Sequence, residues 1–223
     1  MDPMKIAQPG EKPVLLAFIA SGTILIFFLA LLSIGGAANW ATVMAGLLAL
    51  LALVASGLLF YFYRDPDRTT PENPGMIYAP GDGRVLSVEQ EREGGGKTVR
   101  IFLSVFDVHV QRLPCSGRVQ AIEYHKGAFK AAMAAAAREN ERLALTIIPD
   151  GRSEPVVVEQ IAGLLARRIE CWMKEGAGGQ AGDRYGIIHF GSQVAVHLPP
   201  SAAPTVIPGV RVSAGVTPIA QWR

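Results

Sequence analysis

The feature that most constrains this chain is a long uncharged stretch near its N-terminus. No Asp, Glu, Lys or Arg occurs between Pro13 and Tyr63, a run of 51 residues, whereas the 160 residues from Arg64 to Arg223 contain 36. The overall hydrophobic content of 50% therefore averages an apolar segment with one of ordinary charge density. This division excludes a simple cytosolic globule, a disordered chain and a polytopic transporter.

The uncharged run contains two apolar stretches, residues 14–34 and 41–62, separated by a Gly-rich turn at 35–40. Each has roughly the 20 residues needed to cross a bilayer, so we expect a two-helix transmembrane hairpin. A signal peptide would have a single short apolar core followed by a polar mature chain. Neither stretch contains an ionisable residue, which indicates an anchor and not a transport pathway.

The flanking charges predict the orientation of this hairpin. Lys5 and Lys12 precede the first stretch, Arg64 and Arg68 follow the second, and the turn between them is uncharged. By the positive-inside rule, both ends face the cytoplasm at the inner membrane. We therefore expect an anchor over residues 1–63 and a cytoplasmic domain over 64–223, which is long enough for one core.

The composition of the second part excludes some partners. The net charge of +2 is too small for a nucleic-acid footprint, and no basic run interrupted by aromatic residues occurs. Cys115 and Cys171 stand alone, without the spacing of a metal site, and are expected to be free buried thiols.

The sequence after residue 76 predicts mostly β-structure. Short runs rich in Val, Ile and Phe, most of them separated by Gly, Pro or Asp, are the expected strands: 99–106, 118–124, 143–148, 156–161, 186–198 and 206–213. An alanine-rich segment at 128–142 is the best helical candidate, and the Gly-rich segment 175–182 reads as a flexible loop. The predicted fold class is α+β, a mainly antiparallel β domain preceded by the two-helix transmembrane hairpin.

Histidines supply one candidate for chemistry. The four histidines form no HExxH or HxH motif, so we expect no metal site. His109 lies in a dense apolar run with Asp107 two residues earlier, on the same face of the expected strand, where a carboxylate could orient the imidazole. His189 and His197 lie at odd offsets from Ser192 and would face away from it on a continuous strand.

Two glycine-containing segments also stand out. Gly81-Asp82-Gly83 has the Asp-Gly signal of a hairpin turn. Gly191-Ser192 interrupts the strand-like run at 186–198, which suggests a bulge or a close backbone approach. This serine is not in a GxSxG nucleophile elbow, because position 194 is Val.

Six segments in order identify a resemblance: YFYRDPDRTTPENPGMIYAPGDGRV, IFLSVFDVHVQRLPCSGRV, EYHKGAF, ENER, QIAGLLARRI and GDRYGIIHFGSQVAVHLP. Together they resemble the phosphatidylserine decarboxylase proenzyme family in its short, membrane-anchored form. The resemblance covers most of the part after the anchor, from about residue 61 to 198, and its specificity comes from the order and spacing of all six segments.

The resemblance implies a self-processing lyase. Cleavage between Gly191 and Ser192 would give a β chain of residues 1–191 and an α chain of residues 192–223, whose first residue becomes a covalent pyruvoyl group. Through a Schiff base, this cofactor would convert phosphatidylserine into phosphatidylethanolamine in the membrane. The resemblance assigns the decarboxylation step to His109 and a part in self-cleavage to Asp82.

One position departs from the family pattern. Longer members have a second histidine three residues after the first, as the supposed base for processing, and this chain has Arg112 there. Arginine stays protonated and cannot act as that base. Either His109 serves both steps or another group activates Ser192, and Arg112 could instead hold the lipid phosphate or carboxylate.

Other functions remain open at this point. The chain could be a non-catalytic membrane-tethered β domain that binds a lipid or protein partner, or a metal-dependent lipid hydrolase that uses His109 and Asp82. A serine head group on an ether lipid would satisfy the same residues as the diacyl lipid. The oligomeric state is also open, a homo-oligomer being one option.

Overall fold

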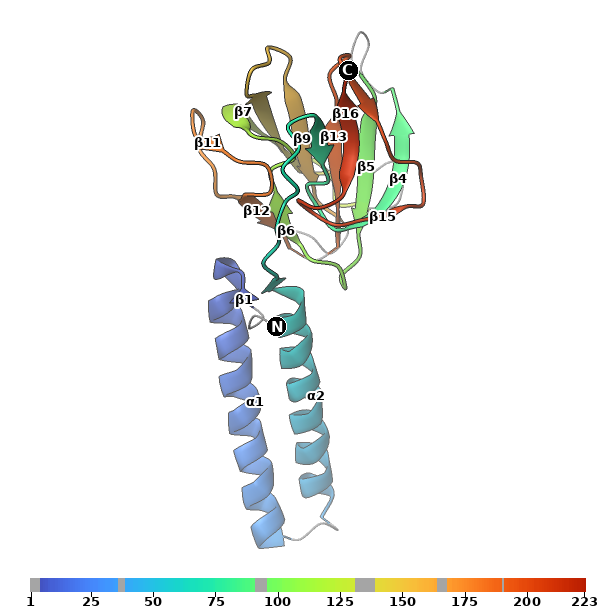
Figure 1. Ribbon diagram of the computed structural model, residues 1–223. Helices are drawn as coiled ribbons and strands as arrows, with labels where there is room; N and C mark the ends of the chain where they lie inside the picture. The colour runs from blue at the N-terminus through green and yellow to red at the C-terminus, as the bar shows by residue number, and fades with distance from the viewer. Residues whose placement is uncertain (1–4, 36–38, 91–95, 131–138, 164–167, 190) are drawn as a thin grey trace. The chain divides into compact units, whose positions relative to one another are not determined.

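The structure, a computed structural model, describes residues 5–35, 39–90, 96–130, 139–163, 168–189 and 191–223 (Figure 1). The chain forms two compact units, Met1–Pro66 and Asp67–Arg223. The first is helical and the second consists mainly of antiparallel strands, which confirms the predicted fold class.

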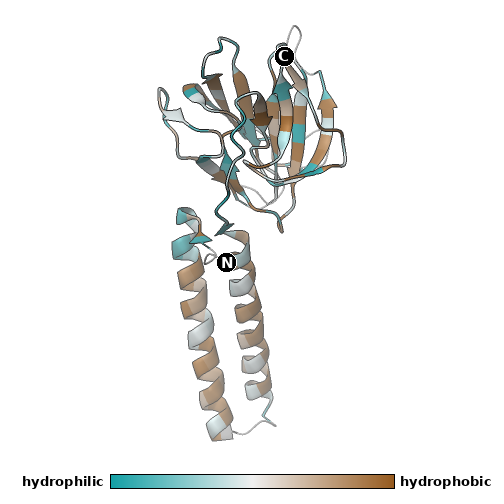
Figure 2. Cartoon of the chain, viewed as in Figure 1, coloured by the Kyte–Doolittle hydropathy of each residue, from teal (hydrophilic) through white to brown (hydrophobic). Residues whose placement is uncertain are grey.

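The first unit contains helices α1 (Gln8–Gly35) and α2 (Trp40–Phe62), with the short strands β1 (Lys5–Ile6) and β2 (Arg64–Asp65) paired antiparallel. Both helices are long and apolar enough to cross a membrane by length and composition. They contain the two stretches predicted from the sequence, and in Figure 2 most of their length has the brown and white of hydrophobic and intermediate residues. Most of their large apolar side chains are exposed, so a soluble core does not cover them.

Small residues bring the two helices together. A Cβ on Gly46 would lie 3.0 Å from the ring of Phe28, so glycine permits this close packing. Ser56 Oγ donates a hydrogen bond to Ser21 Oγ at 3.4 Å across the same interface. The side chain of Asn39 accepts the Ala41 N–H at 3.0 Å and caps the start of α2.

In the second unit, the described residues form one large and two small sheets (Figure 1). The eight-stranded sheet has, in spatial order, β11 (Gly178–Gly179), β7 (Gly117–His125), β8 (Arg142–Pro149), β9 (Val156–Ile161), β13 (Ser192–His197), β5 (Thr98–Leu103), β4 (Gly83–Glu89) and β15 (Arg211–Val212). One three-stranded sheet has β10 (Ile169–Cys171), β12 (Arg184–Ile188) and β6 (Val110–Arg112). The other has β14 (Ala202–Pro204), β16 (Pro218–Trp222) and β3 (Met76–Tyr78).

The core lies where the inward faces of these sheets meet. Val194 and Val196 of β13 pair with Ile101 and Val99 of β5, and all four are fully buried. The same buried cluster includes Ile77, Leu113, Tyr185 and Ile219 from the smaller sheets and their connections. Because alternate residues of a strand share a face, Ser192 faces this core together with Val194.

Several predicted elements differ from the structure. The run at 186–198 is not one strand: β12 ends at Ile188 and β13 begins at Ser192, in different sheets. The Asp-Gly hairpin is also wrong, because β3 and β4 on either side of Asp82 belong to different sheets. Of the run 206–213, only Arg211–Val212 pairs as a strand.

The helix predicted at 128–142 falls largely on residues 131–138, outside the described part of the chain. At its ends, Ala128 and Asn140 form an isolated parallel bridge, and Arg142 already belongs to β8. The loop predicted at 175–182 is present, except that Gly178–Gly179 forms the two-residue strand β11.

Candidate active site

The Gly191–Ser192 junction combines an unusual backbone with a buried hydroxyl. Gly191 has φ +66°, a left-handed conformation that costs other residues about 1–2 kcal/mol. This turn explains why the strand-like run divides between two sheets. Ser192, the first residue of β13, is fully buried opposite Leu103, and its Oγ has no hydrogen-bond partner among the described residues.

His109 contacts the same junction. It lies just before β6 and is fully buried. Its Nδ1 is 2.9 Å from the main-chain oxygen of Asp107, and because a carbonyl only accepts, Nδ1 carries the proton. The lone pair of Nε2 therefore accepts the Gly191 N–H at 3.3 Å. The site thus contains a neutral imidazole whose basic nitrogen faces the residue before Ser192.

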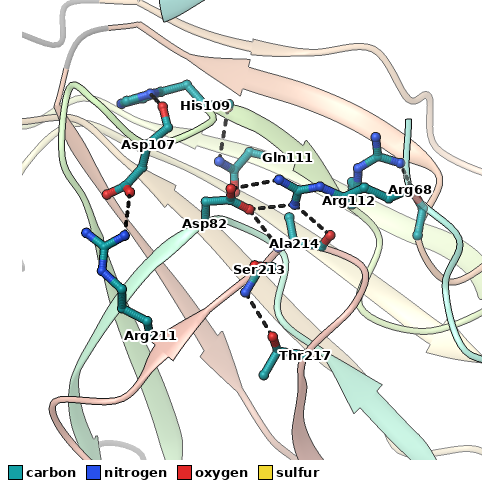
Figure 3. A network of polar contacts seen from close by, with 11 residues as sticks. Arg68, Asp82, Asp107, His109, Gln111, Arg112, Arg211, Ser213, Ala214 and Thr217 are labelled. Atoms are coloured by element: carbon teal, nitrogen blue, oxygen red, sulfur yellow. Dashed lines mark hydrogen bonds and ion pairs between the residues drawn. The ribbon is translucent and has the colours of Figure 1, made fainter. Parts of the chain in front are cut away.

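Asp107 orients His109 differently from the sequence-based interpretation. Strand β5 ends at Leu103, and the next residues turn, so Asp107 and His109 do not share a strand face. The main-chain oxygen of Asp107 holds the imidazole, whereas its carboxylate accepts the Ser104 N–H at 2.9 Å and lies 3.6 Å from Arg211 Nη1 (Figure 3). The carboxylate therefore fixes the loop that presents the carbonyl.

Asp82 is held in a bidentate ion pair. Arg68 donates to both of its carboxylate oxygens, at 2.5 and 2.7 Å, and the Ala214 N–H donates to one of them at 2.8 Å (Figure 3). The neighbouring Gly81 packs closely, since a Cβ there would lie 2.9 Å from Gln111 Oε1 and 3.2 Å from Val194 Cγ1. The turn that contains Asp82 therefore supports β13 two residues after Ser192.

Arg112 is buried and bonded to main-chain groups. The main-chain N–H of Arg112 donates to Pro80 O at 2.8 Å, and its side-chain Nη1 donates to Gly182 O at 2.9 Å. Its Cδ lies 3.0 Å from where a Cβ on Gly215 would be. These contacts join β6 to three separate turns of the second unit.

The structure therefore brings Gly191, Ser192 and His109 into one cluster. Asp82 lies outside this cluster and is connected to it indirectly. The adjacent Gly81 packs against Gln111, and Gln111 Nε2 donates to His109 O at 3.1 Å (Figure 3). The described residues include no group of three or more His, Cys, Asp or Glu side chains that could hold a metal ion.

The other histidines have structural contacts. His197 Nδ1 bonds Thr98 Oγ1 at 2.8 Å. His189 Nε2 lies 3.3 Å from Glu170 Oε1, and burial lowers the pKa of this imidazole despite the carboxylate, which favours its neutral form. Both cysteines are free, and burial raises the pKa of Cys115 to about 12, so that it stays a thiol.

The sequence did not single out several polar residues around the site. The fully buried glutamines Gln111 and Gln160 keep three amide atoms without a partner among the described residues. Gln160 pairs with Val194 across the sheet, and Gln111 lies beside Gly81. The sequence did contain a signal for these two residues, because each is a glutamine inside a mostly apolar stretch, Gln111 in β6 and Gln160 in β9. The role of Arg68 gave no such signal, because its partner Asp82 follows 14 residues later.

The Arg68–Asp82 pair predicts a stability effect. The two side chains are only 12% and 16% exposed, so Arg68→Ala leaves a largely buried carboxylate without its cation. We expect a loss of about 3 kcal/mol in the free energy of unfolding of the second unit, measured by thermal or urea unfolding. The matched variant Arg184→Ala removes an ion pair with Asp67 whose side chains are 35% and 39% exposed. Its free energy of unfolding should fall by less than about 1 kcal/mol. Equal losses would contradict this interpretation.

Comparison with known proteins gives consistent matches. A family model described as phosphatidylserine decarboxylase matches residues 56–220. A phosphatidylserine decarboxylase proenzyme from Gluconacetobacter diazotrophicus is 44% identical over 75% of this chain and 80% of its own length. Another from Symbiobacterium thermophilum is 46% identical over 77% and 83%. A third, from a Mycobacterium species, is 38% identical over 98% of this chain and 91% of its own, so that match extends over both apolar helices.

Proposed function

The chain belongs to the phosphatidylserine decarboxylase family, and we propose that it makes its own pyruvoyl cofactor by self-cleavage between Gly191 and Ser192. One observation carries this proposal: a left-handed glycine precedes a buried serine whose hydroxyl has no hydrogen-bond partner among the described residues, beside the basic nitrogen of His109. Such a serine lowers the stability of the fold, because a buried hydroxyl without a partner loses its hydration. Packing alone therefore does not account for a serine at this position, whereas a chemical role does.

The proposed cleavage starts with attack of Ser192 Oγ on the Gly191 carbonyl carbon. The acyl group moves from nitrogen to oxygen, which gives an ester and a free Ser192 amine. Loss of the Ser192 Cα proton then breaks the Cβ–Oγ bond and releases the Gly191 carboxylate. The dehydroalanine left at position 192 tautomerises to an imine, water adds, and ammonia departs to leave the pyruvoyl group. The products are chains 1–191 and 192–223.

Of the residues considered as the processing base, we propose His109. Its Nε2 already accepts a hydrogen bond from the residue that is cleaved, and this 3.3 Å bond is long enough to exchange for the Ser192 hydroxyl at little cost. Arg112 is a permanent cation, and both oxygens of Asp82 are held by Arg68. For Asp82 we propose a positioning role in place of a direct part in self-cleavage, and for Arg112 a positioning role in place of substrate binding.

The same histidine is proposed as the proton donor in decarboxylation. A pyruvoyl group at position 192 would supply an electrophilic carbonyl for the head-group amine and a sink for the electrons released with CO₂. The Asp107 carbonyl keeps the His109 proton on Nδ1, so Nε2 is the nitrogen that takes up and returns protons at position 192. Ser192 is fully buried in the uncut chain, which fits a precursor in which position 192 becomes accessible to substrate only after cleavage.

For location, we propose that α1 and α2 anchor the chain in the inner membrane with the second unit in the cytoplasm. Their length and composition are sufficient to cross a bilayer. The positive charges of Lys5 and Lys12, near the start of α1, and of Arg64, just after α2, support this orientation, whereas Arg68 is paired with Asp82.

The test of this function uses the full chain in nanodiscs that contain phosphatidylserine. We expect phosphatidylethanolamine and CO₂ as products, and cyanoborohydride should attach labelled substrate to the fragment that starts at position 192. The reaction should continue in EDTA, whereas a metal-dependent hydrolase would stop and would release a free head group. A serine head group on an ether lipid should react comparably if recognition is confined to the head group. Absence of any lipid conversion would favour the tethered binding domain.

A further inference from the structure

The loop between β5 and β6 presents apolar side chains to solvent beside the site. Phe106 is 62% exposed, and Val105 is also exposed. Val105 Cγ1 lies 3.6 Å from where a Cβ on Gly191 would be, so this loop adjoins the cleavage junction. Asp107 and Ser104 hold the loop in place by a hydrogen bond, which makes the exposure of Phe106 a feature of an ordered turn.

A second segment adds cations and further apolar surface. Arg211 lies 3.6 Å from Asp107 and is 72% exposed at its side chain (Figure 3). Its cross-strand partner is Arg84, also exposed, which donates to Gly209 O at 3.2 Å. In the turn that Arg84 holds, Ile207 is 68% exposed and Val210 is exposed too.

These residues form what we call the apolar rim, made of Val105, Phe106, Ile207 and Val210 with Arg84 and Arg211. Adjacent exposed apolar side chains usually mark an interaction surface. Aromatic side chains favour the interface of a bilayer, and each nearby Arg or Lys adds attraction to anionic lipids of about 1 kcal/mol. The composition of the rim therefore matches a membrane surface that is apolar beneath and negatively charged outside.

We propose that the apolar rim docks on the surface of an anionic phospholipid bilayer, with Phe106 inserted at the head-group level. The inference rests on the proposed function, because a lipid substrate keeps its tails in the membrane while its head group must reach position 192. Docking places the Val105 side of the loop, and with it Gly191, next to the head groups. The cations attract the same negative charge that the substrate itself carries.

Fluorescence of a single labelled cysteine tests this proposal without relying on activity. Phe106→Cys in a Cys171→Ser background is labelled with the environment-sensitive dye NBD, and Cys115 stays unlabelled because it is a buried thiol with a pKa of about 12. Tyr124→Cys, at an exposed aromatic position on β7, is the matched control. The full chain is reconstituted in phosphatidylcholine nanodiscs with or without an equal share of phosphatidylglycerol.

We expect a blue shift of emission at position 106 in the anionic nanodiscs, none at 124, and a smaller shift at 106 when Arg84→Gln is added. Equal emission at 106 and 124 would overturn the docking proposal. A shift at 106 that is as large without phosphatidylglycerol would overturn the choice of an anionic surface. Cleavage of each variant is read separately by mass, so an uncut chain reports failure of the proposed function, while a cut chain without the shift reports failure of docking alone.

Kinetics supply a second measurement. Phe106→Ser should raise the interfacial KM for phosphatidylserine in nanodiscs about tenfold, a change expected for partial burial of one aromatic side chain. The kcat for a soluble short-chain phosphatidylserine should stay unchanged, and Tyr124→Ser should alter neither value. An unchanged interfacial KM in Phe106→Ser would contradict the proposal.

Discussion

Replacing Ser192 with alanine is expected to leave an uncut chain and to remove decarboxylase activity. Alanine has no oxygen to attack the Gly191 carbonyl, so neither the ester nor the pyruvoyl group can form. Without this covalent electrophile the activity should fall on the order of 10⁶-fold, as when an enzyme loses its nucleophile. Denaturing electrophoresis and phosphatidylethanolamine formation measure the two effects on the same sample.

The fold should survive this substitution, which separates loss of chemistry from misfolding. Ser192 Oγ is buried without a partner among the described residues, and its removal should keep or raise the free energy of unfolding, by about 1 kcal/mol. Ser87→Ala, at a half-buried serine of β4, is the matched control and should be cleaved normally. An active, cleaved Ser192→Ala protein would disprove the proposed origin of the cofactor.

Replacing His109 with alanine is expected to have the second largest effect. The substitution removes the only imidazole that contacts Gly191 among the described residues. If His109 moves protons in both steps, self-cleavage slows and decarboxylation by the cleaved fraction falls about 10²- to 10⁴-fold. The time course of cleavage after synthesis gives the first rate, and activity per mole of the 192–223 fragment gives the second.

His125→Ala is the matched control for this variant, since the His125 side chain is 42% exposed and lies 3.6 Å from Glu123. It should be cleaved and active like the unchanged protein. Normal cleavage of His109→Ala with loss of decarboxylation would limit His109 to the decarboxylation step. Another group would then have to act as the base in self-cleavage. Normal rates in both steps would remove His109 from the mechanism.

Features that depend on local composition could be predicted from the sequence. The uncharged run predicted two apolar helices, and the strands at 143–148 and 156–161 were predicted because Val and Ile cluster between turn-forming residues. The glycine at 191 indicated a bulge or a close backbone approach within one strand, whereas its left-handed φ and the division of the run between two sheets became clear only in the structure.

The contacts that arrange the site could not be predicted, because they join distant parts of the chain. Arg112 and Gly182 are 70 residues apart, and His109 and Gly191 are 82 apart. Nothing in the local pattern around Asp82 indicates that Arg68 neutralises it. Asp107 illustrates a different difficulty: alternation predicted a shared strand face, but β5 ends at Leu103 and the main-chain carbonyl takes the place of the carboxylate.

The central claim is that Ser192 becomes the pyruvoyl group of a cleaved enzyme, and intact-mass analysis of the purified full-length protein tests it most directly. The account predicts two fragments, residues 1–191 and residues 192–223, the second with a blocked N-terminus whose mass equals pyruvoyl in place of serine. A single unmodified chain of 23.8 kDa from a protein that converts phosphatidylserine would contradict it.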